Sequence, residues 1–185
     1  MSAQIRCSDV VRAAFRDVMR GVASTVTVVT ACDARLCHGM TATSVTSVSM
    51  DPPSLLVCVN SNTLLHDILL ATRRFCVNIL RSSQADISAA FGGAVDARSR
   101  FGTGAWAYTG DGIAYLTDAQ ANVFCRKAAL VPYGSHAVVI GEVETVDLRQ
   151  APSEPLIYQN ARYCVSVAAP AAARSGRAGL LQRGS

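Results

Sequence analysis

Short runs of β-branched and apolar residues follow one another along most of this chain, with few helical segments between them. Such runs occupy residues 24–30, 40–50, 54–59, 74–80 and 136–146, and each has a composition typical of a strand. Their order excludes a regular alternation of strands and helices, which would build a parallel sheet. With about six to eight strands and about three short helices, the pattern predicts a mainly β fold with peripheral helices, arranged as an antiparallel barrel.

Three segments carry helix signals. Ser8 is a candidate N-cap for a run whose apolar residues recur at helical spacing up to Gly21. Thr63 or Asn62 is expected to cap a helix over residues 64–72, and Ser83 one over residues 84–91 that ends at Gly92-Gly93. These helices are too few to separate the strands, so they are expected at the periphery of the barrel.

Residues 94–117 are rich in Gly and polar side chains, and we expect them to form a surface loop. The segment Gly102–Ala107 matches the dinucleotide fingerprint G-x-G-x-x-A. That fingerprint requires a strand before it and a helix after it, and neither is indicated here. It is therefore interpreted as a loop. Gly134-Ser135 is expected to be a turn, and Gly141 a bulge or a point of close approach.

The length of 185 residues fits one domain, and half of the residues are apolar. We expect a domain over residues 1–167 and a low-complexity, disordered tail over residues 168–185. The formal net charge is +4, but three Arg in that tail leave +1 on the domain. No basic stripe remains to follow a phosphate backbone, so no nucleic-acid partner is expected.

No apolar run approaches the ~20 residues that span a bilayer, and residues 1–10 lack the apolar core of a secretory signal. No membrane partner is therefore expected, and the protein is predicted to be cytoplasmic. The seven Cys are odd in number and show no disulfide framework, so free, largely buried thiols are expected. Cys32, Cys37 and His38 lie close in sequence but lack a fourth ligand, and no metal site is predicted.

The segment Met40–Met50 carries six hydroxyl side chains within ten positions. Read as one strand, it places hydroxyls on both of its faces. This is either a Thr/Ser-rich edge strand or a strand that presents hydroxyls to a polar heteroaromatic ligand. Residues 60–63, Asn-Ser-Asn-Thr, precede a helix and form either an anion site or a simple N-cap. His136 begins the longest β-rich run, where a lone His is more often structural than catalytic.

Taken in order, these segments resemble the flavin reductase-like family, the small reductase components of two-component flavin-dependent monooxygenases. The similarity lies in FRDVMRGVASTVTVVT (15–30), HGMTATSVTSVSMDPPSLLVCVN (38–60), RFCVNIL (74–80), GSHAVVIGEV (134–143) and PLIY (155–158). The resemblance implies a Greek-key-related, FMN-binding split β-barrel and a homodimer. It also implies hydride transfer from NADH or NADPH to FMN or FAD, and delivery of the reduced flavin to a separate oxygenase component.

The resemblance also implies roles for individual residues. The family positions beside the flavin ring match Thr41, Ala42, Thr43 and Ser44, and the same wall continues through Ser47, Val48 and Ser49. The loop that meets the flavin phosphate matches Asn60, Ser61 and Thr63. His136 matches the family histidine at the nicotinamide site, and Tyr158 and Tyr163 match positions near the same mouth.

Two positions depart from the family pattern. Ser135 stands where the family often has Asp, which alters how His136 is oriented, and Ala161 stands where it often has Gly. Two alternatives to the reductase remain at this point. One is a flavin-binding carrier or redox sensor without catalysis, and the other is a reductase of a different acceptor such as a corrinoid or a metal chelate.

Overall fold

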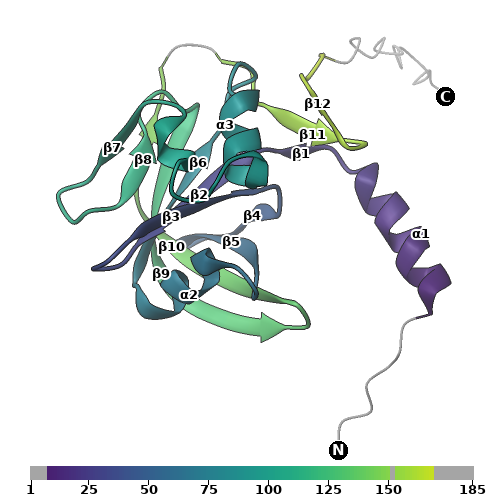
Figure 1. The fold of residues 1–185 in the computed structure, drawn as a ribbon, viewed down its shortest axis with the longest axis horizontal. Helices are drawn as coiled ribbons and strands as arrows, with labels where there is room; N and C mark the ends of the chain where they lie inside the picture. Colours follow the sequence, from purple (N-terminus) through teal and green to yellow (C-terminus); the bar gives the residue numbers. More distant parts are fainter. Residues whose placement is uncertain (1–7, 151–152, 169–185) are drawn as a thin grey trace, which may run out of the picture.

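A seven-stranded antiparallel sheet forms the centre of the molecule (Figure 1). The computed structural model describes residues 8–150 and 153–168, so the expected tail lies outside the described residues except for Ala168. The spatial order of the strands is β3-β2-β6-β9-β10-β5-β4. In chain order they are β2 (Thr27–Cys32), β3 (Cys37–Ala42), β4 (Val45–Met50), β5 (Pro53–Asn60), β6 (Arg74–Ile79), β9 (Ala121–Tyr133) and β10 (His136–Leu148). The predicted mainly β fold is confirmed.

Smaller elements surround this sheet. They are α1 (Asp9–Arg20), β1 (Ser24–Thr25), α2 (Leu64–Ala71), α3 (Ala85–Ala89), β7 (Trp106–Tyr108), β8 (Ala114–Leu116), β11 (Ile157–Gln159) and β12 (Arg162–Cys164). Strands β1, β11 and β12 form one small sheet, and β7 and β8 form another. A π-helical turn (Ala90–Ala94) continues α3, and a 3-10 turn covers Arg100–Gly102. Within the described ranges no helix is long and apolar enough to cross a membrane.

The prediction of a single strand over Met40–Met50 is wrong, because this segment is divided between two strands, β3 and β4, which Thr43-Ser44 connect. These two strands lie at opposite edges of the sheet. The short link spans at most about 11 Å, whereas a flat sheet of seven strands would separate its edges by about 29 Å. The sheet must therefore curl until its edges approach each other. A backbone hydrogen bond of 3.1 Å from the Cys58 N–H to the Ser44 carbonyl oxygen joins the junction to β5.

The barrel interior is filled by apolar side chains from both halves of the sheet and from α2. Phe75, Leu65 and Leu69 are among its fully buried members. Gly141 lies where β10 shifts register against β9, which confirms the expected bulge. A Cβ atom at this position would lie 2.5 Å from the Phe75 ring and 2.8 Å from the Cys125 Cβ. Only glycine fits beside that ring.

A second apolar cluster lies between the sheet and α3. Phe91, Phe101 and Trp106 pack against one another with ring centroids 4.9–5.2 Å apart. Ala114 and Leu116 of β8 are fully buried. The expectation of a surface loop over residues 94–117 is therefore wrong for these positions. Aromatic and apolar side chains within a Gly-rich segment bury enough surface to order it.

The predicted starts of α1 and α2 are confirmed. The Val11 N–H donates to the Ser8 hydroxyl oxygen at 3.2 Å, and the His66 N–H donates to the Thr63 hydroxyl oxygen at 3.4 Å. The predicted cap of α3 is wrong, because the helix begins after Gln84 rather than Ser83. The Gln84 side chain instead accepts a hydrogen bond of 2.9 Å from the Arg81 N–H.

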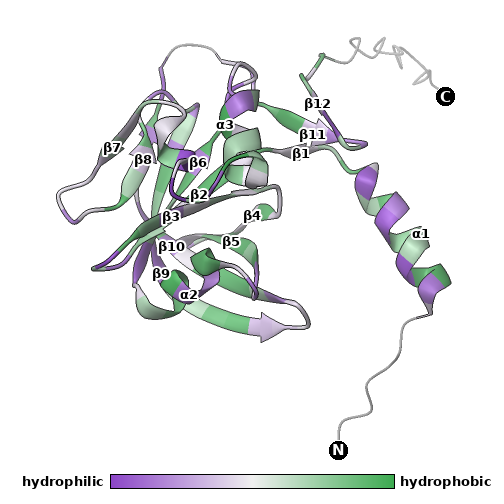
Figure 2. Cartoon of the chain, viewed as in Figure 1, coloured by the Kyte–Doolittle hydropathy of each residue, from purple (hydrophilic) through white to green (hydrophobic). Residues whose placement is uncertain are grey.

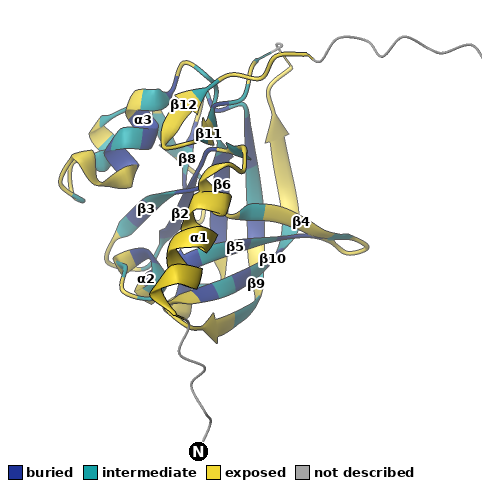
Figure 3. Ribbon diagram, turned by 90° about the vertical axis from the view of Figure 1, so that its right-hand side faces the viewer, coloured by how far each residue is buried: buried dark blue, intermediate teal, exposed yellow. Residues whose placement is uncertain are grey.

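Helix α1 extends away from the barrel, and none of its residues is buried (Figure 1; Figure 3). It is amphipathic, with apolar and charged residues on different sides (Figure 2). Phe15 is 65% exposed and Val18 is 66% exposed. The described residues hold the helix mainly at its C-terminal end, where the Asn160 N–H donates to the Arg20 carbonyl oxygen at 2.7 Å. The other described residues therefore leave much of its apolar face uncovered.

The cysteine expectation is partly wrong. Cys32 and Cys37 face each other across β2 and β3 and are joined by a disulfide. Cys76 and Cys125 are buried free thiols as expected. Burial raises the pKa of Cys76 well above its ordinary value, and burial followed by the charge of Glu144 raises the pKa of Cys125 to about 12. These two thiols therefore stay protonated and unreactive at neutral pH.

The turn between β11 and β12 yields a prediction about stability. Asn160 and Ala161 have φ values of 51° and 59°, a conformation that Asn adopts more readily than Ala, for which it costs about 1–2 kcal/mol. We expect Ala161→Gly to raise the free energy of unfolding by about 0.5–1 kcal/mol, measured by denaturant unfolding. Asn160→Gly is the control and should change stability less. A loss of stability in Ala161→Gly would show that the positive φ of Ala161 does not strain the native turn.

His38 yields a prediction about pH. Its side chain is buried, and its Nε2 lies 3.3 Å from the Arg100 guanidinium. Burial lowers the pKa of His38 below its ordinary 6.5, and the charge of Arg100 lowers it further. The unfolded chain therefore takes up a proton first as the pH falls. Stability is fully present above pH 6.5 and should decline below it, by at most about 1.4 kcal/mol per pH unit.

The measurement is the free energy of unfolding between pH 7.5 and 5.5, for the wild type and His38→Gln. The uncharged side chain should flatten the profile below pH 6.5. Equal slopes in the two proteins would show that His38 does not carry this pH dependence.

Candidate functional site

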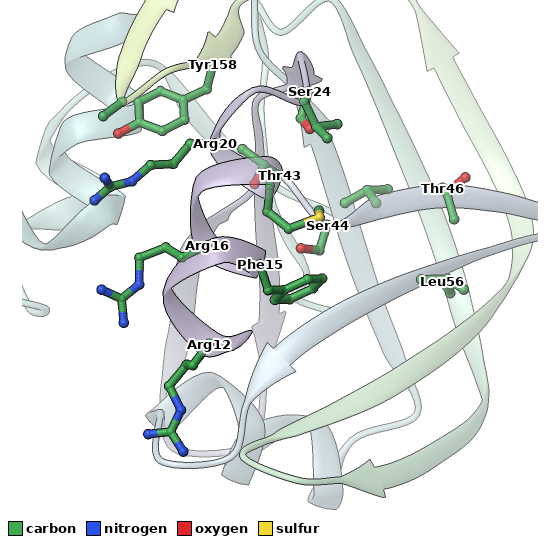
Figure 4. A pocket seen from close by; sticks show the side chains of 14 residues that line it. Arg12, Phe15, Arg16, Arg20, Ser24, Thr43, Ser44, Thr46, Leu56 and Tyr158 are labelled. Carbon is green, nitrogen blue, oxygen red and sulfur yellow. The ribbon is translucent and has the colours of Figure 1, made fainter. Parts of the chain in front are cut away.

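A cavity of about 830 Å³ separates α1 from the junction of β3 and β4 (Figure 4). Phe15 points from α1 toward Ser44 across this space (Figure 4). The cavity is lined by Arg12, Phe15, Arg16, Met19, Arg20, Val22, Ser24, Thr43, Ser44, Val45, Thr46, Leu56, Tyr158 and Ala161. It combines an apolar lining with hydroxyls and cationic groups, the composition of a small-molecule site.

The hydroxyls of the β3–β4 junction are available to a ligand. Thr43, Ser44 and Thr46 line the cavity, and their side chains make no hydrogen bond with any other described residue. Because the ladder is interrupted at residues 43–44, backbone groups are also left outside regular pairing there. The junction can therefore hydrogen-bond a polar ligand without fixed charge. Ala42, the residue before the junction, is not available to a ligand in this way, because it is buried and its carbonyl oxygen accepts a hydrogen bond from Thr27.

A second cavity, of about 430 Å³, shares two lining residues with the first, Thr43 and Tyr158. The backbone and the hydroxyl of Ser88 organise its wall. The Thr41 hydroxyl donates to the Ser88 carbonyl oxygen at 2.7 Å, and the Tyr163 hydroxyl donates to the Ser88 Oγ at 2.9 Å. The rings of Tyr158 and Tyr163 meet edge to face with centroids 5.5 Å apart. The structure thus brings Thr41, Thr43, Ser44 and both tyrosines together around two adjoining cavities.

Three residues that the resemblance assigns to the flavin wall are separated from the Thr43-Ser44 junction, and their contact with a flavin stays a prediction. Ser47, Val48 and Ser49 follow β4 away from the junction and line neither cavity. The Ser49 hydroxyl is engaged in the following turn, where it accepts a hydrogen bond of 3.0 Å from the Asp51 N–H. The two strands that replace the single expected strand explain this separation, because β4 runs along the opposite edge of the sheet from β3.

A separate cluster forms where β5 ends and β10 begins. His136 lies opposite Asn60 in the register of these strands, and the Ser61 N–H donates to the Ser135 carbonyl oxygen at 3.0 Å. The Ser135 Oγ lies 2.9 Å from the His136 Nδ1, in place of the carboxylate that the family often has there. Asn60, Ser61 and His136, which the sequence resemblance assigns to the site, are therefore neighbours in space. Along β5, Asn60 is two residues from Cys58, which is hydrogen-bonded to the junction.

The polar side chains of this second cluster also satisfy the local backbone. The Thr63 hydroxyl donates to the Asn60 carbonyl oxygen at 2.7 Å and accepts from the first turn of α2. The Asn60 Oδ1 accepts a hydrogen bond of 2.9 Å from the Asn62 N–H. The structure therefore contains the alternative role of this segment, that of a helix cap. The Ser61 side chain takes no part in the cap and has no hydrogen-bond partner among the described residues.

Three arginines of α1 were not anticipated as site residues. Arg12, Arg16 and Arg20 recur every four residues and extend along one side of the helix (Figure 4). Arg20 lies 3.7 Å from the Asp17 carboxylate, whereas Arg12 and Arg16 form no ion pair with a described residue. Their four-residue spacing is apparent in the sequence. Charged residues on one face of a helix are usually exposed to solvent, however, so this spacing alone did not indicate a site. The location of α1 beside the hydroxyl junction makes it part of a cavity.

Comparisons with known proteins agree over most of the chain. The family model described as flavin reductase like domain matches residues 19–166. The reductase component of an FADH2-dependent resorcinol hydroxylase from Rhizobium sp. (strain MTP-10005) is 48% identical over 155 residues, which cover 82% of this chain and 86% of the relative. An FMN reductase (NADH) from Pseudomonas syringae pv. syringae (strain B728a) is 36% identical, with 81% and 84% covered.

A solved structure shows the same similarity in three dimensions. The Streptomyces globisporus C-1027 NADH:FAD oxidoreductase, in complex with NAD and FAD fragments, superposes with a TM-score of 0.78 at 30% identity. The alignment covers 92% of this chain and 100% of that one. The barrel described above is thus the split barrel of these reductases, as the sequence resemblance implied. On the extent of the family match and on these identities, the chain belongs to the flavin reductase like domain family.

Proposed function

We propose that this chain is an NAD(P)H:flavin oxidoreductase that reduces FMN or FAD and supplies the reduced flavin to a separate monooxygenase component. The observation that carries the proposal is the family match over residues 19–166, which contains the hydroxyl junction and every lining residue of the two cavities except Arg12, Phe15 and Arg16. We assign the activity to the domain of residues 1–167. The named relatives include reductases of FMN and a component that serves an FADH2-dependent hydroxylase.

The proposed reaction requires little acid–base catalysis by the protein. The reduced nicotinamide supplies the hydride, which passes from its C4 to the N5 of the flavin when the two rings stack at close range and water is excluded. The chain must bind and align two ring systems. Two cavities, of about 830 Å³ and about 430 Å³, that share Thr43 and Tyr158 in their linings support that task.

The proposed flavin contacts begin at the junction. The hydroxyls of Thr43 and Ser44 hydrogen-bond the polar edge of the ring, while Thr41 and Ala42 hold the end of β3 in place through their own hydrogen bonds. Tyr158 and Tyr163 flank the mouth that the two cavities share. The family correspondence extends the proposed flavin site to Ser47, Val48, Ser49, Asn60, Ser61 and Thr63.

The direct test is a steady-state assay of the full chain with two flavins and two nicotinamides in all four pairs. Consumption of NADH or NADPH that depends on added FMN or FAD is expected, and the preferred pair identifies both substrates. Flavin that copurifies tightly without any nicotinamide consumption would instead support a carrier. Faster turnover with a corrinoid or metal chelate than with free flavin would contradict the assigned acceptor.

We propose His136 as the residue that contacts the nicotinamide. We expect His136→Ala to raise the KM for the nicotinamide or to lower turnover by about tenfold, the scale of one lost polar contact. The Kd for flavin should remain unchanged. Steady-state kinetics and flavin titration measure these quantities separately.

Ser135→Ala serves as the matched control for the His136 variant, because it removes only the neighbouring hydroxyl 2.9 Å from the imidazole. Its effect on the nicotinamide KM should be smaller than that of His136→Ala. An equal loss of flavin and nicotinamide binding in His136→Ala would show that this residue is misassigned.

We further propose that the protein is a homodimer in which a second copy covers the apolar face of α1. Val11, Phe15 and Val18 on this face are each more than half exposed, and an isolated helix of 12 residues is marginal in water. The same surface lies beside the proposed flavin cavity, so a second copy would also shield it from water. A cytoplasmic location is part of this proposal, because NADH and NADPH are intracellular coenzymes.

The dimer is tested with Val18→Glu, because Val18 is 66% exposed and does not line the cavity. A buried, unpaired carboxylate should weaken association by at least tenfold, which sedimentation equilibrium measures. Ala13→Glu adds the same charge on the polar side of α1 and should leave the assembly unchanged. Equal behaviour of the two variants would contradict a dimer built on this face.

A further inference from the structure

The Cys32–Cys37 disulfide has no role in the proposed flavin reaction. It closes the far end of the β2–β3 hairpin, four residues before Thr41. The two cysteines are opposite partners in the strand register, with their Cα atoms 4.0 Å apart. Both side chains are only partly buried, unlike the buried thiols of Cys76 and Cys125.

The hairpin does not depend on the disulfide for its shape. The Asp33 Oδ1 accepts hydrogen bonds of 2.8 Å from the backbone N–H groups of Arg35 and Leu36. The Asp33 N–H in turn donates to the Leu36 carbonyl oxygen at 3.0 Å. These bonds, with the register from Thr27–Ala42 to Cys32–Cys37, hold the strands together independently of the sulfur atoms. The two sulfurs therefore remain opposed when the bond is reduced.

Both cysteines line a cavity of about 460 Å³ that also reaches the turn between β7 and β8. This volume is in the range of small-molecule sites. The carboxylates in its lining are already engaged: Asp33 caps the hairpin, and Asp111 pairs with Arg74 at 2.8 Å. Arg73 lines the same cavity, is exposed, and forms no ion pair with any described residue. The cavity thus offers an accessible disulfide together with one uncommitted cation.

The structure also contains a partner for the reduced form. The Cys37 Sγ lies 3.6 Å from the Gly112 carbonyl oxygen. After reduction, the Cys37 thiol can donate a hydrogen bond to this oxygen without moving the backbone. The oxidised and reduced states are therefore both compatible with the same fold.

We propose that Cys32 and Cys37 form a thiol–disulfide exchange site for small acidic thiols of the glutathione class. A thiolate attacks one sulfur and forms a mixed disulfide, while the other cysteine leaves as a thiolate and takes up a proton. A second thiolate attacks the mixed disulfide, releases the oxidised thiol as a disulfide and frees the remaining cysteine. Two thiols lose two electrons, and the protein disulfide gains them. Arg73 attracts the carboxylates of the incoming thiol.

The first experiment follows the two cysteines in the full-length, folded protein. The protein is equilibrated with reduced or oxidised glutathione, alkylated, and analysed by peptide mass spectrometry, while its melting temperature is recorded. Cys32 and Cys37 should interconvert reversibly between free and bonded forms, with a cooperative melt in both. Reduction that requires denaturant, or a pair that never forms with oxidised glutathione, would overturn the proposal.

The second experiment tests recognition of the acidic thiol. Arg73→Gln should slow reduction by glutathione about two- to fivefold, the effect of one exposed charge pair, and high salt should abolish the difference. Reduction by neutral 2-mercaptoethanol should not change. Arg149→Gln is the matched control, because Arg149 follows the end of β10 that pairs with Ala121, remote from the hairpin. Equal rates for Arg73→Gln and wild type with glutathione would overturn the assigned ligand class. Neither experiment involves flavin, so its outcome is independent of the proposed reductase activity.

Discussion

The link between β3 and β4 is the constraint on which the rest of the structure depends. Two residues, Thr43 and Ser44, connect strands at opposite edges of a seven-stranded sheet. A link of this length spans only about a third of the width of a flat seven-stranded sheet. The sheet therefore has to curl, and its curling encloses the barrel interior. The same link cannot complete regular strand pairing. The closure of the barrel and the free hydroxyls of the site therefore have one cause.

The elements that sequence reasoning predicted correctly depend on local chemistry. Ser8 and Thr63 cap helices because a hydroxyl can accept from a free N–H a few residues ahead, and Gly141 marks a contact that no side chain can tolerate. The break at residues 43–44 could not be predicted in the same way. No Gly or Pro interrupts the β-branched run there, and the turn is imposed by the strands that flank it.

Long-range packing accounts for the other differences. The aromatic cluster of Phe91, Phe101 and Trp106 orders a segment whose glycines suggested a loop, because the partners are separated in sequence. The disulfide follows from the register of β2 and β3, which a count of cysteines does not reveal. The family resemblance supplied the site residues, including Ser47, Val48 and Ser49, whose place in the flavin site stays a prediction. Only the structure separates the junction from Ser47, Val48 and Ser49.

The electrostatics of the site change the interpretation of the chain's charge. The domain is nearly neutral, and neutral donors alone were expected to meet an anionic ligand. Arg12 and Arg16 line the same cavity as the hydroxyl junction and form no ion pair with a described residue, but they extend from the side of α1 that faces away from Phe15 and Ser44 (Figure 4). Like charges four residues apart weaken a helix slightly, and an anion bound along this side of α1 would offset that repulsion. Under the proposed function, the neutral hydroxyls of Thr43 and Ser44 would hold the flavin ring by hydrogen bonds without fixed charge, which is compatible with release of the reduced flavin to a separate component.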